Sequence, residues 1–214
     1  MMKQRPSTIH TRRDVLGTGL AGMTALVFAS SHPLEPWQAV PTAFAGESTL
    51  PLTPACSDAD DPTPAQTEGP YYKPNSPERQ ALREAGMAGT PLRLSGLVLS
   101  RRCEPAARIL LDFWQADDRG AYDNQGHRLR GHQFTDESGR YHLETIIPGL
   151  YPGRTRHIHV KVQPPNGSIL TSQLYFPGEP RNRRDRLFRP ALLLRTEEAS
   201  HGQIATFNFV LDIA

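Results

Sequence analysis

Short runs of alternating hydrophobic and polar residues recur along the chain from about residue 90 to its end. The clearest run is 204–213, where Ala205, Phe207, Phe209 and Leu211 share one face of an extended segment. Further strands are predicted at 92–99, 108–114, 141–146, 156–162, 172–176 and 191–196. Turn-forming Asp-Xaa-Xaa-Gly and Pro-Gly elements separate these runs, at 117–120, 136–139, 148–149 and 177–178. The pattern predicts an all-β fold, an antiparallel β-sandwich of about eight short strands.

One segment before these strands carries the signals of a helix start. Ser76 is a good N-cap, Pro77 suits the first helical position, and Glu78 favours the positive end of a helix. The helix should end near Gly86 or Gly89. We therefore expect one or two short helices beside the sandwich.

Residues 1–45 differ from the rest of the chain. An arginine pair, Arg12 and Arg13, precedes a weakly apolar run at 15–29 that includes three glycines. A membrane span needs roughly 20 apolar residues, so we expect no stable span here. Ala43 and Ala45 place small residues where a signal peptidase reads. The segment resembles a twin-arginine export signal, and an uncleaved anchor or an amphipathic N-terminal helix is the alternative.

The export signal predicts a division of the chain into three parts and a place for the mature protein. Residues 1–45 are the signal peptide, 46–62 an N-terminal linker, and 63–214 the β-sandwich domain. The mature protein is expected to be periplasmic or secreted, and twin-arginine export allows it to fold in the cytoplasm first.

Composition narrows the function classes. With 37% hydrophobic and 21% charged residues, the 214-residue chain can bury a core. Residues 1–45 contain four of the 24 basic and two of the 22 acidic residues, which leaves 20 of each and no net charge. A neutral domain argues against nucleic-acid binding. Two cysteines exclude a four-thiolate zinc site, and in an exported protein we expect one Cys56–Cys103 disulfide.

Two histidines and two tyrosines suggest a metal site. His157 and His159 are two apart on a predicted strand, so both imidazoles project from the same face and can chelate a transition metal. Hydrogen-bonded or exposed histidines are the alternative. Tyr122 and Tyr151 lie in turns rich in glycine and proline. A phenolate is a hard anionic oxygen ligand, and it suits ferric iron better than zinc or cuprous copper.

At these residues the chain resembles the intradiol ring-cleavage dioxygenases, the non-haem Fe(III) enzymes of catechol and protocatechuate breakdown. The segment GLYPGRTRHIHVKV at 149–162 carries most of the likeness. The resemblance runs from about 63 to 176 and includes QTEGPYY at 66–72, DFWQAD at 112–117, GAY at 120–122 and SQLYF at 172–176. It implies that Tyr122, Tyr151, His157 and His159 hold the iron, with Arg154 and Gln173 in the pocket.

The resemblance also implies a reaction. Fe(3+) would be the cofactor, and a catechol-type diol and O2 the substrates, without NAD, flavin or haem. The product would be a cis,cis-muconate-type diacid. Tyr151 would be a ligand and then a base, and Arg154 would stabilise anionic charge on the substrate. The chain is short between Tyr151 and His157 and has no long helical N-terminal region, as in the compact exported branch of the family. The identity of the catechol and the oligomeric state stay open.

Several alternatives remain at this point. A catalytically silent exported β-sandwich that binds a ligand is one, and a copper or zinc enzyme that uses only His157 and His159 is another. Tyr71 and Tyr72 are expected in the pocket wall or in plain packing, and Trp114 in the core. The basic segment 181–186 is expected to be a solvated face, or else a patch for an anionic substrate or for surface attachment.

Overall fold

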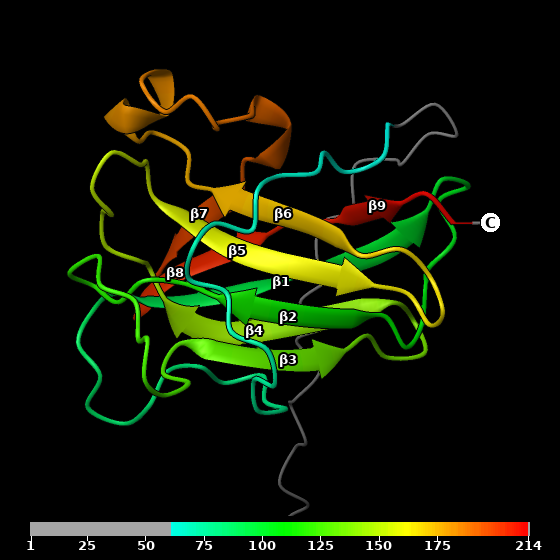
Figure 1. Ribbon diagram of the computed structural model, residues 1–214, viewed down its shortest axis with the longest axis horizontal. Coiled ribbons are helices and arrows are strands. Elements are labelled where there is room, and N and C mark those ends of the chain that lie inside the picture. Colours follow the sequence, from blue (N-terminus) through cyan, green and yellow to red (C-terminus); the bar gives the residue numbers. More distant parts are fainter. Residues whose placement is uncertain (1–60, 214) are drawn as a thin grey trace, which may run out of the picture. The chain divides into compact units, whose positions relative to one another are not determined.

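Two β-sheets and two short 3₁₀ helices make up the computed structural model, which describes residues 61–213. The first sheet has the strand order β3–β2–β5–β6, with β2 at Leu110–Trp114, β3 at Arg130–Phe134, β5 at His157–Gln163 and β6 at Leu170–Tyr175. The second has the order β4–β1–β8–β7, with β9 also paired to β1. Its strands are β1 (Pro91–Ser100), β4 (Arg140–Ile146), β7 (Arg195–Ala199), β8 (Gly202–Thr206) and β9 (Phe209–Leu211). The helices are η1 (Pro180–Arg183) and η2 (Pro190–Leu192). The predicted β-sandwich with one or two short helices is confirmed (Figure 1).

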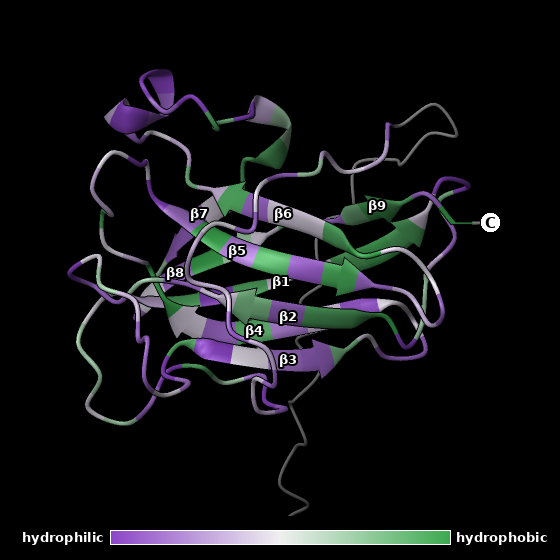
Figure 2. Cartoon of the chain, in the orientation of Figure 1, coloured by the Kyte–Doolittle hydropathy of each residue, from purple (hydrophilic) through white to green (hydrophobic). Residues whose placement is uncertain are grey.

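The core lies between the two sheets and follows from the alternation along each strand. On β5, Ile158, Val160 and Val162 are fully buried in the main apolar cluster, together with Leu111 and Phe113 of β2. Figure 2 shows the alternating polar and apolar residues along β5. Each such side chain contributes about 1.5–3 kcal/mol through burial. The alternate residues of β5 therefore point to the opposite face, which we call the outer face of the β3–β2–β5–β6 sheet.

Strand pairing decides which side chains share this outer face. In the antiparallel register His159 lies opposite both Trp114 of β2 and Gln173 of β6, and His157 lies opposite Tyr175. Paired residues project to the same side of a sheet. Most of the other pairings are also antiparallel, although β1 pairs in parallel with both β8 and β9. The outer face thus gathers imidazole, indole, amide and phenol groups around one end of β5.

The prediction of a helix that starts at Ser76 is wrong. Residue Glu78 instead forms an isolated bridge to β3, and Ala81 forms one to β4. Backbone groups of this segment bond to both strands, for example Arg79 N to His132 O at 2.9 Å. The Ser76 hydroxyl donates to Asp112 Oδ1 at 2.8 Å and caps nothing. β3 and β4 are edge strands, so each has backbone groups that are free to bond to this segment. These bonds satisfy the backbone N–H and C=O groups of the segment without a helix.

We call residues 63–82 the strap, because they run along the outer face from one edge of the sandwich to the other. The strap begins at β9, where Thr63 N donates to Val210 O at 2.9 Å. It then crosses β6, where Gln66 N donates to Thr171 O at 2.8 Å, and reaches β3 and β4 at its end. In Figure 1 the strap is the cyan to blue-green segment in front of β6, β5 and β2.

Three strand predictions also need correction. The strand predicted at 191–196 is instead the end of η2 followed by β7, which begins only at Arg195. Strand β3 was not predicted, and the single run 204–213 is broken into β8 and β9. The break is at Phe207 and Asn208, whose amide Oδ1 accepts from Leu97 N at 2.9 Å. Phe207 O lies so close to Gly96 that a Cβ there would be 1.7 Å away. The chain therefore crosses β1 at a glycine before it resumes as β9.

The predicted signal 1–45 and most of the linker 46–62 lie outside the described residues. Cys56 does too, so its pairing with Cys103 stays a prediction, although Cys103 is not a free thiol. Within 61–213, no helix is long and apolar enough to cross a membrane.

Candidate active site

Three potential ligand atoms converge at the start of β5. The Nε2 atoms of His157 and His159 are 3.1 Å apart, and the Tyr122 hydroxyl lies 3.3 Å from His157 Nε2. Both histidines are buried, with side chains on the outer face. The predicted same-face arrangement of the two imidazoles is therefore what the strand produces.

Both imidazoles are neutral and at least one presents a lone pair to the cluster. Burial, followed by the charge of Arg154, lowers the pKa of His157 to about 4. Burial also lowers the pKa of His159, and the neighbouring His157 adds to this effect. His157 Nδ1 is 2.7 Å from Thr155 O. Since a carbonyl only accepts, Nδ1 carries the proton and Nε2 keeps its lone pair. This is the tautomer that metal-ligating histidines adopt.

Tyr122 and Tyr151 are held together by contact between their two turns. Asp117 Oδ1 accepts from the backbone N of Arg119 at 3.0 Å and of Ala121 at 2.9 Å, which shapes the turn before Tyr122. Asp117 O accepts from Gly149 N in the second turn at 2.7 Å. The Tyr122 and Tyr151 rings are consequently 6.0 Å apart between centroids.

A third tyrosine, Tyr71 of the strap, belongs to the same cluster. Its ring stacks on Tyr122 with 4.4 Å between centroids, and its hydroxyl is 3.0 Å from that of Tyr151. The hydrogen bond to Tyr151 raises the pKa of Tyr71. Burial raises the pKa of Tyr122 far above its ordinary value, so this phenol keeps its proton unless a cation lies beside it. Tyr71 thus lies in the site itself and not only in packing.

Arg154 and Gln173 contact each other at the edge of the cluster. Arg154 Nη2 donates to Gln173 Oε1 at 2.6 Å, and Tyr175 donates to the same oxygen at 3.0 Å. Gln173 Nε2 donates to Thr67 O of the strap at 2.8 Å. Gln173 is fully buried, so its amide orientation is set by these partners. The six residues singled out in the sequence therefore lie in one connected site.

The far wall of the site is aromatic. The Trp114 indole is buried and stacks on His159 with 4.8 Å between centroids and 10° between planes. The strap covers the other side, where a Cβ on Gly69 would lie 3.5 Å from His159 Cε1. Trp114 was expected in the core; it is buried, but it lies on the outer face and not in the apolar cluster between the sheets, and its stacking fixes the plane of the His159 ring.

The donor set suits a ferric ion better than the other metals considered. Among residues 61–213, no three His, Cys, Asp or Glu side chains gather as ligands, so the cluster combines two imidazoles with phenols. His159 Nδ1 is buried without a hydrogen-bond partner, and two Nε2 atoms at 3.1 Å leave room for a shared cation. Phenolate oxygen is a hard ligand, and a cation at this point would favour its ionised form.

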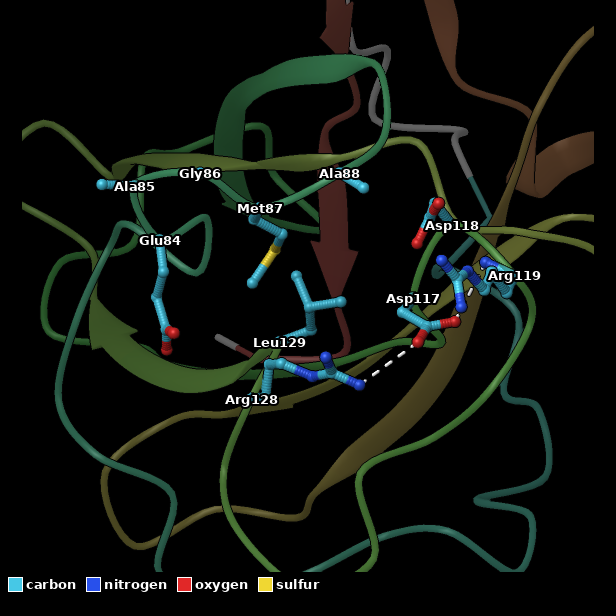
Figure 3. A pocket seen from close by; sticks show the side chains of 10 residues that line it. All are labelled: Glu84, Ala85, Gly86, Met87, Ala88, Asp117, Asp118, Arg119, Arg128 and Leu129. Carbon is cyan, nitrogen blue, oxygen red and sulfur yellow. Dashed lines mark hydrogen bonds and ion pairs between the residues drawn. The ribbon is translucent and has the colours of Figure 1, made fainter.

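A separate pocket is lined in part by Asp117, Asp118 and Arg119, which come shortly before Tyr122 in the chain (Figure 3). Its volume is about 460 Å³, and its lining includes Met87, Asp117, Arg119, Arg128 and Leu129. None of the six predicted site residues lines it. Asp117 there accepts from Arg128 Nη2 at 3.2 Å and from the backbone N of Arg119. The pocket therefore shares Asp117, which shapes the turn before Tyr122, with the support of the candidate site.

The loop after Tyr122 provides a prediction for acid stability. Asp123 accepts from the backbone N of Gln125, Gly126 and Arg128 at 2.8–3.0 Å, which lowers its pKa to about 2. A lowered carboxyl pKa stabilises the fold above the unfolded value of about 3.9, and the effect is lost as pH falls toward 2. Asp123→Asn should therefore flatten the loss of stability between pH 4 and pH 2. Urea denaturation across this range measures it, and an unchanged slope would contradict the assignment.

Comparison with known proteins agrees with this geometry. A family profile described as "Dioxygenase" matches residues 67–213, which includes every candidate residue. The chain belongs to the intradiol ring-cleavage dioxygenase family.

Individual relatives support the family. The chain is 32% identical to the protocatechuate 3,4-dioxygenase beta chain of Burkholderia cepacia over 152 residues, which is 63% of this chain and 62% of that one. Hydroxyquinol 1,2-dioxygenase of Rhizobium sp. (strain MTP-10005) is 27% identical over 166 residues, covering 63% of this chain and 56% of that one. The chain thus spans less than two thirds of the length of these curated members.

One solved member of the family matches over its full length. It is the dioxygenase domain of a dioxygenase and carbohydrate-binding protein fusion from Streptomyces sp. SirexAA-E. Identity is 59%, the TM-score is 0.71, and the match covers 72% of this chain and 100% of that one. The 3-chlorocatechol 1,2-dioxygenase of Rhodococcus opacus 1CP is 27% identical with a TM-score of 0.66, covering 74% and 76% of the two chains.

Proposed function

We propose that the protein is an Fe(III)-dependent intradiol dioxygenase that cleaves a catechol-type diol with O2 to a cis,cis-muconate-type diacid. The observation that carries this proposal is the convergence of His157 Nε2, His159 Nε2 and the Tyr122 hydroxyl within 3.1–3.3 Å, with Tyr151 beside them. Tyr122, Tyr151, His157 and His159 would hold the iron. Ferric iron held there would supply Lewis acidity toward the substrate diol.

The side chains divide the remaining work between them. The hydroxyl oxygen of Tyr151 is hydrogen-bonded to that of Tyr71. As a phenolate, Tyr151 would accept a proton from the substrate diol. The Arg154 guanidinium bonds to Gln173 and Tyr175, which lie opposite the two histidines on β5, and stabilises anionic charge that develops on the substrate. Gln173, on β6, accepts from Arg154 at 2.6 Å and so holds the guanidinium in place. Burial of the cluster keeps the local dielectric low, which strengthens each of these interactions.

The test is anaerobic addition of catechol to protein loaded with ferric iron, followed by O2 and mass identification of the product. We expect a red-brown protein because tyrosinate–Fe(III) pairs absorb visible light, and a muconate-type diacid that contains both oxygen atoms. Labelling with ¹⁸O2 checks the last point. A colourless protein after ferric reconstitution would contradict the iron assignment. A ring-cleaved semialdehyde would contradict intradiol cleavage.

We also propose that the protein is exported through the twin-arginine route. The support is the Arg12–Arg13 pair, the short apolar run after it, and the small residues at Ala43 and Ala45. Fractionation of cells that express the full chain, compared with an Arg12→Lys, Arg13→Lys variant, tests the route. Retention of the variant inside the cell is the expected result, and equal export of both would contradict it.

A further inference from the structure

We infer that Asp185 is a positioning residue, whose carboxylate fixes the Arg154 guanidinium beside the candidate ligands. This inference rests on the proposed function. Asp185 lies in the loop after η1, between β6 and β7, far in sequence from the turn that carries Arg154. It adds a residue to the site that neither the motif at 149–162 nor the basic composition of its own loop indicates.

The Asp185 carboxylate is buried and fully used. Its Oδ2 accepts from Arg154 Nε at 2.9 Å and from Thr155 N at 2.8 Å, and its Oδ1 accepts from Leu187 N at 2.9 Å. Only 3% of the side chain is exposed. Burial alone would raise the pKa of Asp185, but these three donors lower it, so the group is ionised. A buried carboxylate with three donors is a rigid anchor for a guanidinium.

The hydrogen bonds of Arg154 fix the orientation of its guanidinium group. Nε is taken by Asp185, and Nη2 donates to Gln173 Oε1 at 2.6 Å and to the Tyr175 hydroxyl at 3.4 Å. Two acceptors on different elements fix the plane of the guanidinium, which a long flexible side chain does not hold alone. Gln173 and Tyr175 lie opposite His159 and His157 in the β5–β6 register, so the positive charge is held next to the candidate ligands.

The same loop also holds Thr155, two residues before β5. Thr155 donates its N–H to Asp185, and its hydroxyl donates to Asn182 Oδ1 at 2.7 Å. The carbonyl of Thr155 accepts from His157 Nδ1, as described above. The loop therefore fixes Arg154 directly and supports the orientation of the His157 ring through Thr155.

Asp185 is unlike its neighbours. The four arginines around it, Arg181, Arg183, Arg184 and Arg186, are all exposed, and none is in an ion pair among residues 61–213. The carboxylate turns inward to Arg154, although four guanidinium groups are close in sequence. The expectation of a solvated face holds for the arginines and is wrong for Asp185.

A double-mutant cycle tests whether Asp185 acts through Arg154. Asp185→Asn should lower kcat about 10- to 100-fold, the range typical of a residue that supports the working groups of a metal site. Arg154→Gln should lower it further, and the double variant should be no slower than Arg154→Gln alone. Multiplying losses in the double variant would overturn the inference, because they would mean independent effects. A kcat of Asp185→Asn within twofold of the wild-type kcat would also overturn the inference.

The matched control is Asp136→Asn. Asp136 also accepts two backbone N–H bonds at 2.9 Å, from Ser138 and Arg140, but in the turn between β3 and β4 and without an arginine side chain. It should leave kcat unchanged. Binding of 4-nitrocatechol without O2, followed by its absorbance, gives a second comparison. We expect its Kd to rise about tenfold in Asp185→Asn and to stay unchanged in the control.

A measurement without turnover separates this inference from the proposed function. In the apo protein, hydrogen exchange of the Arg154 Nε–H followed by NMR should be slow, and it should become at least about tenfold faster in Asp185→Asn, because the buried bond is lost. Equal exchange rates in the two proteins would overturn the anchor even if the enzyme is active. Slow exchange in a protein that cleaves no catechol would contradict the proposed function and leave the anchor standing.

Discussion

His157→Ala is expected to abolish ferric iron binding and to lower ring cleavage by more than about 100-fold, beyond the loss typical of a residue that only supports a ligand. The reason is geometric, since His157 Nε2 contacts both His159 Nε2 at 3.1 Å and the Tyr122 hydroxyl at 3.3 Å. Its removal takes away the atom on which the other two converge. Iron content by elemental analysis and the visible absorption of the reconstituted protein measure the effect.

His142→Ala is the matched control for this substitution. His142 is also a strand histidine, on β4, but its side chain is exposed and on the other sheet. We expect it to keep both iron and turnover. Full iron occupancy in His157→Ala, with the colour of the unchanged protein, would remove the ligand assignment.

Gly120→Ala is expected to separate the two turns that carry Tyr122 and Tyr151. Gly120 has φ +84, and a Cβ there would lie 2.3 Å from Leu150 O. The left-handed backbone costs an alanine about 1–2 kcal/mol, and the overlap with backbone adds about 1–3 kcal/mol. We expect a loss of about 2–5 kcal/mol in the free energy of unfolding, together with iron binding at least tenfold weaker, measured by urea denaturation and iron titration.

Gly178→Ala separates backbone strain from the clash. Gly178 has φ +73, and nothing lies within 4 Å of the Cβ position. It should therefore lose only about 1–2 kcal/mol and keep its iron affinity. Equal iron affinity in Gly120→Ala and Gly178→Ala would mean that contact between the turns does not position the tyrosines.

Alternation predicted the strands whose inner face lies in the core, such as β5, because burial of Ile158 and Val160 depends on local sequence alone. Alternation failed where the environment of a residue is set by a segment that is distant in the sequence. Gly131 of β3 faces the strap, and a Cβ there would lie 2.7 Å from Leu82 Cδ2, so a strand with a glycine at its centre gave no apolar alternation. The Ser76 segment was predicted as a helix because its capping signals are local, whereas its actual partners are on β3 and β4.

The same difference between local signals and contacts with distant segments decides which residues of the candidate site could be predicted. The two tyrosines and two histidines suggested the metal site, the family resemblance added Arg154 and Gln173, and the fold brings these six residues together. For Tyr71 the sequence left pocket wall and plain packing open, and it placed Asp185 on a solvated face, because the contacts of both residues arise from tertiary structure. Tyr71 reaches Tyr151 across 80 positions, and Asp185 reaches Arg154 across 31. In a run of arginines, a single aspartate carries no local signal that it is buried.

The strap has a consequence for the order in which the site is assembled during synthesis. It is among the first described residues to leave the ribosome, yet its partners are Val210, Thr171 and Gln173, which are made much later. A nascent chain that ends before residue 210 already contains both histidines, but lacks the strand against which the strap begins. The wall formed by Gly69 and Tyr71 therefore closes over His159 and Tyr122 only after residue 210 has been made and has left the ribosome.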